Sequence, residues 1–153
     1  MRKRATVRPD AYGAAVALLA RRDLASAEVS TRLEARGYPG EEIASALAVL
    51  KEQRALDDVR YAQGQVQSRS ERGQGPLRIR EHLIGVGLPL PLVEAALVAG
   101  PSWAELAGHV RQRRFGEEPP RTEADAAQQA RFLQYRGFTA DQIRRVTGVE
   151  VDQ

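Results

Sequence analysis

The sequence has no cysteine, only two histidines and few aromatic residues, and each shortage excludes a class of site. Without cysteine, the 153-residue chain can form neither a disulfide nor a thiolate metal site. His82 and His109 have no cluster of possible metal ligands beside them, so we expect no zinc site, no haem and no other cofactor. Because aromatic residues make up 5% of the chain, alanine and leucine are expected to provide most of the core packing.

Long apolar segments are also missing, and a membrane-spanning helix needs about 20 consecutive apolar residues. The basic segment 1–4 followed by the apolar run 11–20 is similar to a signal peptide. However, Asp10 interrupts the approach, and Arg21 and Arg22 stand where a cleavage site needs small residues. We therefore expect a cytoplasmic protein that makes no contact with a membrane.

A short motif recurs every 50 residues and is the most informative feature of the chain. It consists of a leucine, three further residues, a glycine and an apolar residue. This pattern is typical of a helix end, where glycine adopts the left-handed conformation and the apolar residue packs back on the leucine. Each copy therefore predicts a helix, a tight turn and a second helix. The copies are Leu33, Gly37 and Tyr38; Leu83, Gly87 and Leu88; and Leu133, Gly137 and Phe138.

Apolar residues at helical spacing extend this motif into a tandem array of three-helix repeats, which presents an elongated surface. In the first helix we expect Tyr12, Val16 and Leu19 to face the core, because they recur at i, i+4 and i+7. No segment alternates regularly between apolar and polar residues, so the predicted fold is all-α. The expected divisions are a basic tail over 1–10 and repeats over 11–56, 57–100 and 101–153.

Local signals for helix starts account for most residues that could otherwise suggest catalysis. Asp57 and Asp58 are interpreted as caps, because acidic groups before a helix accept hydrogen bonds from its free N–H groups. His82 is expected on a solvated helix face. With no nucleophile, base and orienting group together, we expect no enzymatic activity. The remaining starts are capping boxes at Ser102 with Glu105 and Thr139 with Gln142, an N-cap at Ser26, and a first helical proline at Pro76.

Positive charge is concentrated locally, although the formal net charge is only +3. The segment 1–10 has a net charge of +3, and the segment 59–80 has +4. Nearly all basic residues are arginine, whose guanidinium group binds phosphates and carboxylates as a fork, although a solvated helix face also needs charge. The candidate binding residues for such an anionic partner are Arg60, Arg69, Arg72, Arg78, Arg80, Arg111, Arg113, Arg114, Arg144 and Arg145.

Three blocks of the sequence resemble the signature of the RecX family of recombination regulators. The similarity runs from about Tyr12 to Val146, and Val86 departs from it, since the other two copies have arginine there. The blocks lie at 56–62, 72–87 and 132–138.

The resemblance implies a curved protein of three three-helix repeats that binds the RecA recombinase filament, in its groove or at its growing end, and also contacts DNA. Such a protein regulates DNA repair and the SOS response by limiting strand exchange, ATP hydrolysis and repressor self-cleavage, and is not an enzyme; we expect a monomer. A filament on single-stranded DNA offers a dense phosphate backbone to arginine clusters on successive repeats. Two alternatives remain open, a stand-alone DNA-binding protein and a helical-repeat scaffold for a protein partner.

Overall fold

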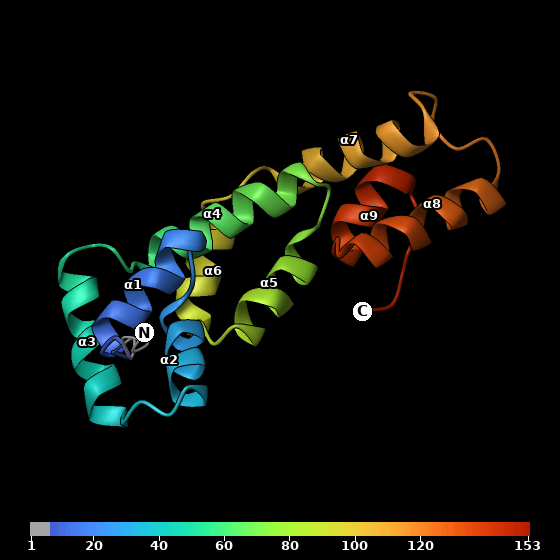
Figure 1. Ribbon diagram of the computed structural model, residues 1–153. Coiled ribbons are helices and arrows are strands. Elements are labelled where there is room, and N and C mark those ends of the chain that lie inside the picture. The colour runs from blue at the N-terminus through green and yellow to red at the C-terminus, as the bar shows by residue number, and fades with distance from the viewer. Residues whose placement is uncertain (1–6) are drawn as a thin grey trace, which may run out of the picture. The chain divides into compact units, whose positions relative to one another are not determined.

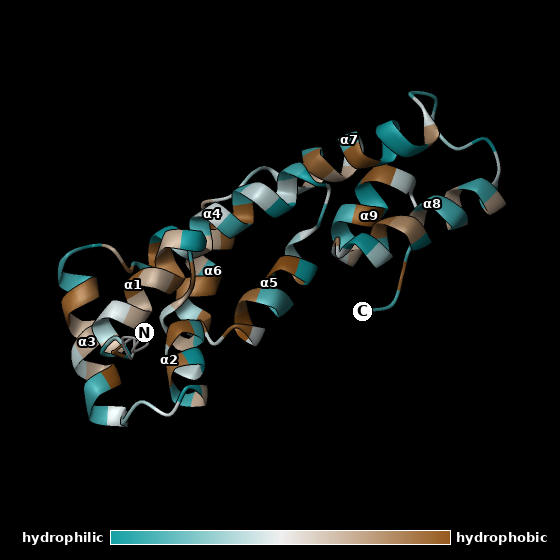
Figure 2. Ribbon diagram, in the orientation of Figure 1, coloured by the Kyte–Doolittle hydropathy of each residue, from teal (hydrophilic) through white to brown (hydrophobic). Residues whose placement is uncertain are grey.

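The computed structural model describes residues 7–153, and this part of the chain folds into nine α-helices without a strand, which confirms the all-α prediction. Figure 1 shows their order, and Figure 2 shows apolar and polar residues mixed along the helices. Of the predicted basic tail, positions 1–6 lie outside the described residues. The helices are α1 (Ala11–Arg21), α2 (Ser26–Ala35), α3 (Gly40–Glu52), α4 (Asp58–Glu71), α5 (Pro76–Gly85), α6 (Leu90–Val98), α7 (Trp103–Phe115), α8 (Glu123–Arg136) and α9 (Ala140–Thr147).

Two compact units divide the chain, Met1–Tyr61 and Ala62–Gln153. Within residues 7–153, no helix is both long enough and apolar enough to cross a bilayer. The same described residues contain no group of three or more His, Cys, Asp or Glu side chains arranged to hold a metal ion.

In the first unit, α1 packs against α2 and α3 through a face of small residues. The predicted face is wrong for Tyr12 and Val16, which remain 37% and 41% exposed, whereas Leu19 packs partly buried against the core as expected. Tyr12 instead donates a hydrogen bond from Oη to Gln53 Oε1 at 3.0 Å. Alanine at the contact lets the helix backbones approach closely, which the larger side chains prevent. The buried residues of α1 are Ala11, Ala14, Ala15 and Leu18.

The second unit buries the apolar positions that the 50-residue repeat predicts there. Val66, Ile79, Leu83, Val93 and Leu97 are each at most 5% exposed. Further along the chain, α9 packs against α7 and α8. Their shared core consists mainly of Ala107, Val110, Ala130, Leu133, Phe138 and Ile143.

The repeated helix ends have the predicted geometry. Gly37, Gly87 and Gly137 have φ of +85°, +92° and +95°, in the left-handed region. In each copy, the N–H of the apolar residue after the glycine donates to the carbonyl oxygen of the repeated leucine, at 3.1–3.2 Å. These bonds satisfy carbonyl groups that a helix end otherwise leaves unpaired.

The predicted helix starts form in part. Thr139 and Gln142 make the expected capping box, with hydrogen bonds of 2.9 and 3.2 Å. Ser102 is the N-cap of α7, but its side chain makes no capping hydrogen bond, so the predicted box there is wrong. Asp57 accepts from the N–H of Arg60 at 3.0 Å, as a cap does.

The N-cap prediction for Ser26 is also wrong, because α2 starts at Ser26 itself and Ala25 occupies the cap position. Ser26 donates from its backbone N–H and from Oγ to the carboxylate of Asp58, both at 2.8 Å. Asp58 therefore caps α2 from outside that helix, rather than the start of α4 in which it lies. Ser26 and Ala25 are buried, and the two bonds are partly shielded from solvent.

Helix α5 is capped at its start by the end of α8. The N–H groups of Gly75 and Leu77 donate to the carbonyl oxygens of Arg136 and Gly137, at 2.8 and 2.9 Å. The contact needs glycine on both sides: a Cβ added to Gly75 would lie 2.4 Å from the carbonyl carbon of Gly137. A Cβ on Gly137 would lie 2.5 Å from Cβ of Arg78. This contact is called the α5–α8 joint below.

Candidate nucleic-acid interface

The basic segment that runs from the end of α4 into α5 does not form one patch, because its arginines enter different surroundings. Arg80 forms an ion pair with Glu94, with Nε 2.7 Å from Oε1. Arg69 contacts Gln65, Gln74 and His82 through hydrogen bonds of 3.0, 3.3 and 2.9 Å. Arg72 lines a cleft with residues of α7 and α8, and Arg78 contacts Tyr135 of α8.

Arg72 lies in a cleft of about 180 Å³ that α7 and α8 complete. Arg113 and Arg114 enter it from the last turn of α7, and Arg136 from the last turn of α8. No acidic side chain lines it. We call this site the arginine cleft, and its lining residues are Arg72, Gly73, Val110, Arg113, Arg114, Phe132 and Arg136.

Aromatic rings hold some of these guanidinium groups in place. Arg136 lies with its guanidinium carbon 5.2 Å from the centroid of the Phe132 ring, one helical turn away on α8. Arg114 lies 5.3 Å from the ring of Phe115 and 5.9 Å from that of Phe132. The two rings meet edge to face at 5.4 Å. Cation–π contacts of this kind orient a guanidinium group. Arg136 also donates from Nη1 to the carbonyl oxygen of Arg72 at 3.4 Å, and its other N–H groups remain for a ligand.

The charge of the cleft is not neutralised by the protein. In the part of the chain that the structure describes, no carboxylate forms an ion pair with any of the four arginines of the cleft. Arg144 and Arg145 differ in this respect, because both pair with Asp141, at 2.6 and 3.0 Å. Four uncompensated cations around one concave surface attract a polyanion and raise its local concentration.

Arg111 is not part of this surface, so its prediction as a binding residue is wrong. Its side chain is buried, and the residue is 5% exposed. The guanidinium group donates to Gln129 Oε1 at 3.2 Å and to the carbonyl oxygens of Gly116, Glu117 and Glu118 at 3.1–3.3 Å. Arg111 therefore fixes the connection between α7 and α8, and its partners are mostly backbone atoms that no sequence pattern reveals.

Two further sequence-based interpretations change. Arg60 is exposed, but its guanidinium group donates to the carbonyl oxygens of Arg54 and Ala55, at 2.9 and 3.3 Å, and so braces the turn before α4. His82 does not lie on a purely solvated face, because its Nε2 is in contact with Arg69. Both side chains therefore already have hydrogen-bond partners within the protein.

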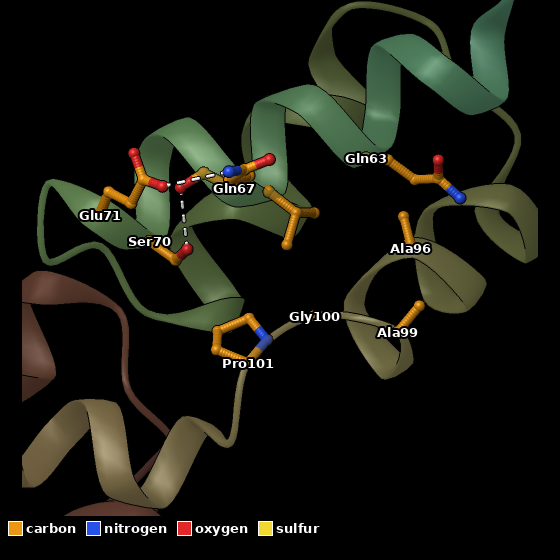
Figure 3. A pocket seen from close by; sticks show the side chains of 9 residues that line it. Gln63, Gln67, Ser70, Glu71, Ala96, Ala99, Gly100 and Pro101 are labelled. Carbon is orange, nitrogen blue, oxygen red and sulfur yellow. Dashed lines mark hydrogen bonds between the residues drawn. The ribbon is translucent and has the colours of Figure 1, made fainter.

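A separate pocket of about 470 Å³ lies between α4, the end of α6 and the segment that follows α6. Figure 3 shows Gln63 of α4 beside Ala96, with Gln67, Ser70 and Glu71 further along α4. Ser70 donates from Oγ to the carbonyl oxygen of Gln67 at 3.0 Å, and no histidine or second acidic residue accompanies Glu71 in the lining. This pocket therefore lacks a nucleophile with an activating base.

Sequence reasoning missed three residues near the arginine cleft. Phe132 and Arg136 have the i, i+4 spacing of neighbours on one helix face, which was the available signal. Tyr135 is 71% exposed, and the guanidinium carbon of Arg78 lies 4.7 Å from its ring centroid. Nothing in the sequence links Tyr135 with Arg78, because the α5–α8 joint brings them together.

Comparisons with known proteins all point to the same family. Three family models match in order: the first three-helix domain of RecX over residues 11–50, the second over 57–97 and the third over 104–147. The regulatory protein RecX of Halorhodospira halophila is 42% identical over 132 residues, which cover 86% of this chain and 82% of that protein. That of Chromohalobacter salexigens is 39% identical over 141 residues, which cover 92% and 90% of the two chains.

Solved structures support the fold. The crystal structure of RecX from Lactobacillus salivarius superposes with a TM-score of 0.78 at 20% identity, covering 89% of this chain and 91% of that one. A second crystal structure of a regulatory protein RecX gives a TM-score of 0.75 at 23% identity, over 91% of this chain and 72% of the other. The ordered family domains and the relatives near 40% identity establish the same assignment that the repeated motif indicates. This chain belongs to the RecX family of regulatory proteins.

Proposed function

We propose that this protein modulates the RecA recombinase, mainly as a negative regulator, by binding the RecA filament on single-stranded DNA. Bound there, it limits strand exchange and ATP hydrolysis in recombination and repair. It acts in the cytoplasm as a monomer, without catalysis of its own and without a cofactor. The observation that carries the proposal is the uncompensated charge of the arginine cleft in a member of a regulatory family.

The pairing of the arginines ranks the candidates for contact with the filament. Arg72, Arg113 and Arg114 face the cleft without a carboxylate partner among residues 7–153, so binding does not require an existing ion pair to break. Arg80 and Arg145 must first leave Glu94 and Asp141. A charge-assisted hydrogen bond contributes about 1.5–3 kcal/mol, so the unpaired residues are expected to dominate.

The test measures ATP hydrolysis by RecA on single-stranded DNA with increasing amounts of this protein. The wild type should lower the rate of ATP hydrolysis. The double variant Arg113→Gln/Arg114→Gln should raise the protein concentration needed for half-inhibition by roughly tenfold or more. The matched control is Arg144→Gln/Arg145→Gln, which removes the same charge from two adjacent exposed arginines that are already paired. Its inhibition should stay close to that of the wild type, because these two arginines are already paired with carboxylates of the protein. Loss of these exposed ion pairs should also change the stability of the fold little.

Recovery of RecA with the immobilised protein separates this proposal from the two alternatives. Recovery that depends on single-stranded DNA and nucleotide supports filament binding. Binding to bare DNA with a steep salt dependence, and no effect on RecA, would indicate a stand-alone DNA-binding protein. Tight binding to RecA without any DNA affinity would indicate a protein scaffold. Unchanged ATP hydrolysis at saturating wild-type protein would exclude the proposed function.

A further inference from the structure

We propose that the arginine cleft and Tyr135 together form a site for a single-stranded nucleic acid, with phosphates in the cleft and an unstacked base on the tyrosine ring. The inference rests on the proposed function only for the expectation that the polyanion is a nucleic acid. It adds which residues hold the strand and why the site distinguishes a single strand from a duplex. It also assigns a role to Phe132, Tyr135 and Arg136, which the sequence did not nominate.

The cleft has the chemistry of a phosphate site. Four guanidinium groups line it, no acidic side chain does, and the buried side chain of Val110 forms part of its wall. Several of its donors are already oriented: Arg72 donates from Nε to the carbonyl oxygen of Ser68 at 3.3 Å, and Arg136 lies over Phe132. Binding therefore orders few additional side-chain torsions, which favours affinity.

Tyr135 has the properties of a base-stacking platform. The residue is 71% exposed, against 37% for Tyr12, and its Oη makes no hydrogen bond within residues 7–153. Arg78 stacks its guanidinium group 4.7 Å from the ring centroid, which fixes the ring and places a positive charge beside it. Single-strand-binding proteins combine such an exposed aromatic ring with cations that follow the phosphate backbone.

The cleft and the platform adjoin because Tyr135 and Arg136 are successive residues in the last turn of α8. Successive side chains on a helix point about 100° apart, since a turn contains about 3.6 residues. A strand with a phosphate at Arg136 therefore has a neighbouring base within reach of Tyr135 around the helix end. The α5–α8 joint holds this helix end through hydrogen bonds of 2.8 and 2.9 Å, so both parts of the site share one rigid support.

The combination selects among polyanions. A duplex presents phosphates to the cleft, but its bases are stacked and paired, so none is free for Tyr135. An acidic peptide satisfies the guanidinium groups with carboxylates but offers no base to stack. Only an unpaired strand uses both the charge of the cleft and the exposed ring.

The test uses the full chain without RecA and follows the fluorescence anisotropy of a dye-labelled oligothymidylate and of a duplex of equal length. If four phosphates are contacted, the logarithm of the binding constant should fall with the logarithm of salt concentration at a slope of about −3, since each phosphate on a single strand contributes about −0.7. Arg113→Gln/Arg114→Gln should make that slope less steep by about 1.4 and weaken both ligands. Arg144→Gln/Arg145→Gln, with the same change of charge, should leave the slope unchanged.

The tyrosine variants separate stacking from charge. Tyr135→Ala should weaken oligothymidylate binding about tenfold and leave duplex binding within twofold, whereas Tyr135→Phe should retain single-strand affinity. Circular dichroism melting at wild-type temperature confirms that each variant is folded. Equal loss for both ligands, or no loss for either, overturns the assignment of Tyr135. Displacement of the oligothymidylate by polyglutamate at equal charge concentration overturns the assignment to nucleic acid.

The same variants distinguish this inference from the proposed function. If Tyr135→Ala loses single-strand binding while inhibition of RecA persists, the strand site is supported and is separate from the inhibitory contact. If wild-type protein inhibits RecA but binds no bare strand at low salt, the strand site is refuted and the proposed function stands. If it binds the strand as described but never inhibits RecA, the strand site stands and the proposed function is refuted.

Discussion

Replacing the glycines of the α5–α8 joint tests whether the joint stabilises the second unit. Gly37→Ala is the control outside the joint. It isolates the conformational cost, because φ of Gly37 is +85° and an added Cβ would meet nothing within 4 Å. Gly75→Ala isolates the steric cost, because its φ of −84° suits alanine but the Cβ would meet Gly137 at 2.4 Å. Gly137→Ala combines both costs, with φ of +95° and the close contact with Arg78.

The expected losses of unfolding free energy differ accordingly. Alanine in the left-handed conformation costs about 1 kcal/mol, which is the prediction for Gly37→Ala. For Gly75→Ala, overpacking of about 1–3 kcal/mol and weakening of two backbone hydrogen bonds, each contributing about 0.5–1.5 kcal/mol, predict a loss of about 2–4 kcal/mol. Gly137→Ala adds the conformational cost, for a total of about 3–5 kcal/mol.

Urea denaturation measures these losses. Trp103 is the single tryptophan and lies in the second unit, so its fluorescence follows the unit that contains Gly75 and Gly137. The first unit has no tryptophan, so the unfolding of Gly37→Ala is followed by far-ultraviolet circular dichroism, which reports the helices of both units. The reasoning fails if Gly37→Ala and Gly137→Ala lose the same stability, or if Gly75→Ala loses less than about 1 kcal/mol.

Two further predictions concern polar contacts. Arg111→Met should destabilise the second unit by about 3 kcal/mol, because it leaves the carbonyl groups after α7 and the side chain of Gln129 without their donor; a tryptophan-fluorescence urea midpoint equal to that of the wild type would contradict the buried role. Thr139→Ala should cost about 1 kcal/mol, whereas Ser102→Ala should cost a few tenths at most, since only Thr139 makes capping hydrogen bonds; equal thermal shifts for the two variants would refute this difference.

The sequence predicted the repeated helix ends well, because those signals are local, whereas the predicted caps at Ser26 and Ser102 were wrong. The leucine and glycine of each repeat interact within a few residues, so their spacing alone specifies the turn. The predicted packing face of α1 was wrong for Tyr12 and Val16, because larger apolar side chains suggest a core more strongly than alanine does. The structure instead buries Ala11 and Ala15, and leaves Tyr12 and Val16 exposed.

The candidate site was only partly predictable, because charge pairing depends on tertiary contacts. The sequence places Arg80 and Arg72 in one basic segment, yet Glu94 neutralises the first while α7 and α8 surround the second. Arg111 and Arg113 are two residues apart, so they leave α7 in different directions, and only Arg111 finds buried acceptors. The number of arginines in a segment therefore does not determine how many are free to bind.

At the α5–α8 joint, the side chain of one residue can be replaced, whereas two glycines cannot. Its hydrogen bonds join main-chain atoms, so the side chain of Arg136 contributes nothing to them although its carbonyl oxygen does. A different side chain at this position keeps these main-chain bonds and loses only the 3.4 Å hydrogen bond from Arg136 Nη1 to the carbonyl oxygen of Arg72. In contrast, Gly75 and Gly137 admit no larger residue without displacement of the backbone. New ligand chemistry can therefore be introduced at the end of α8 by single substitutions, with little risk to the fold that supports it.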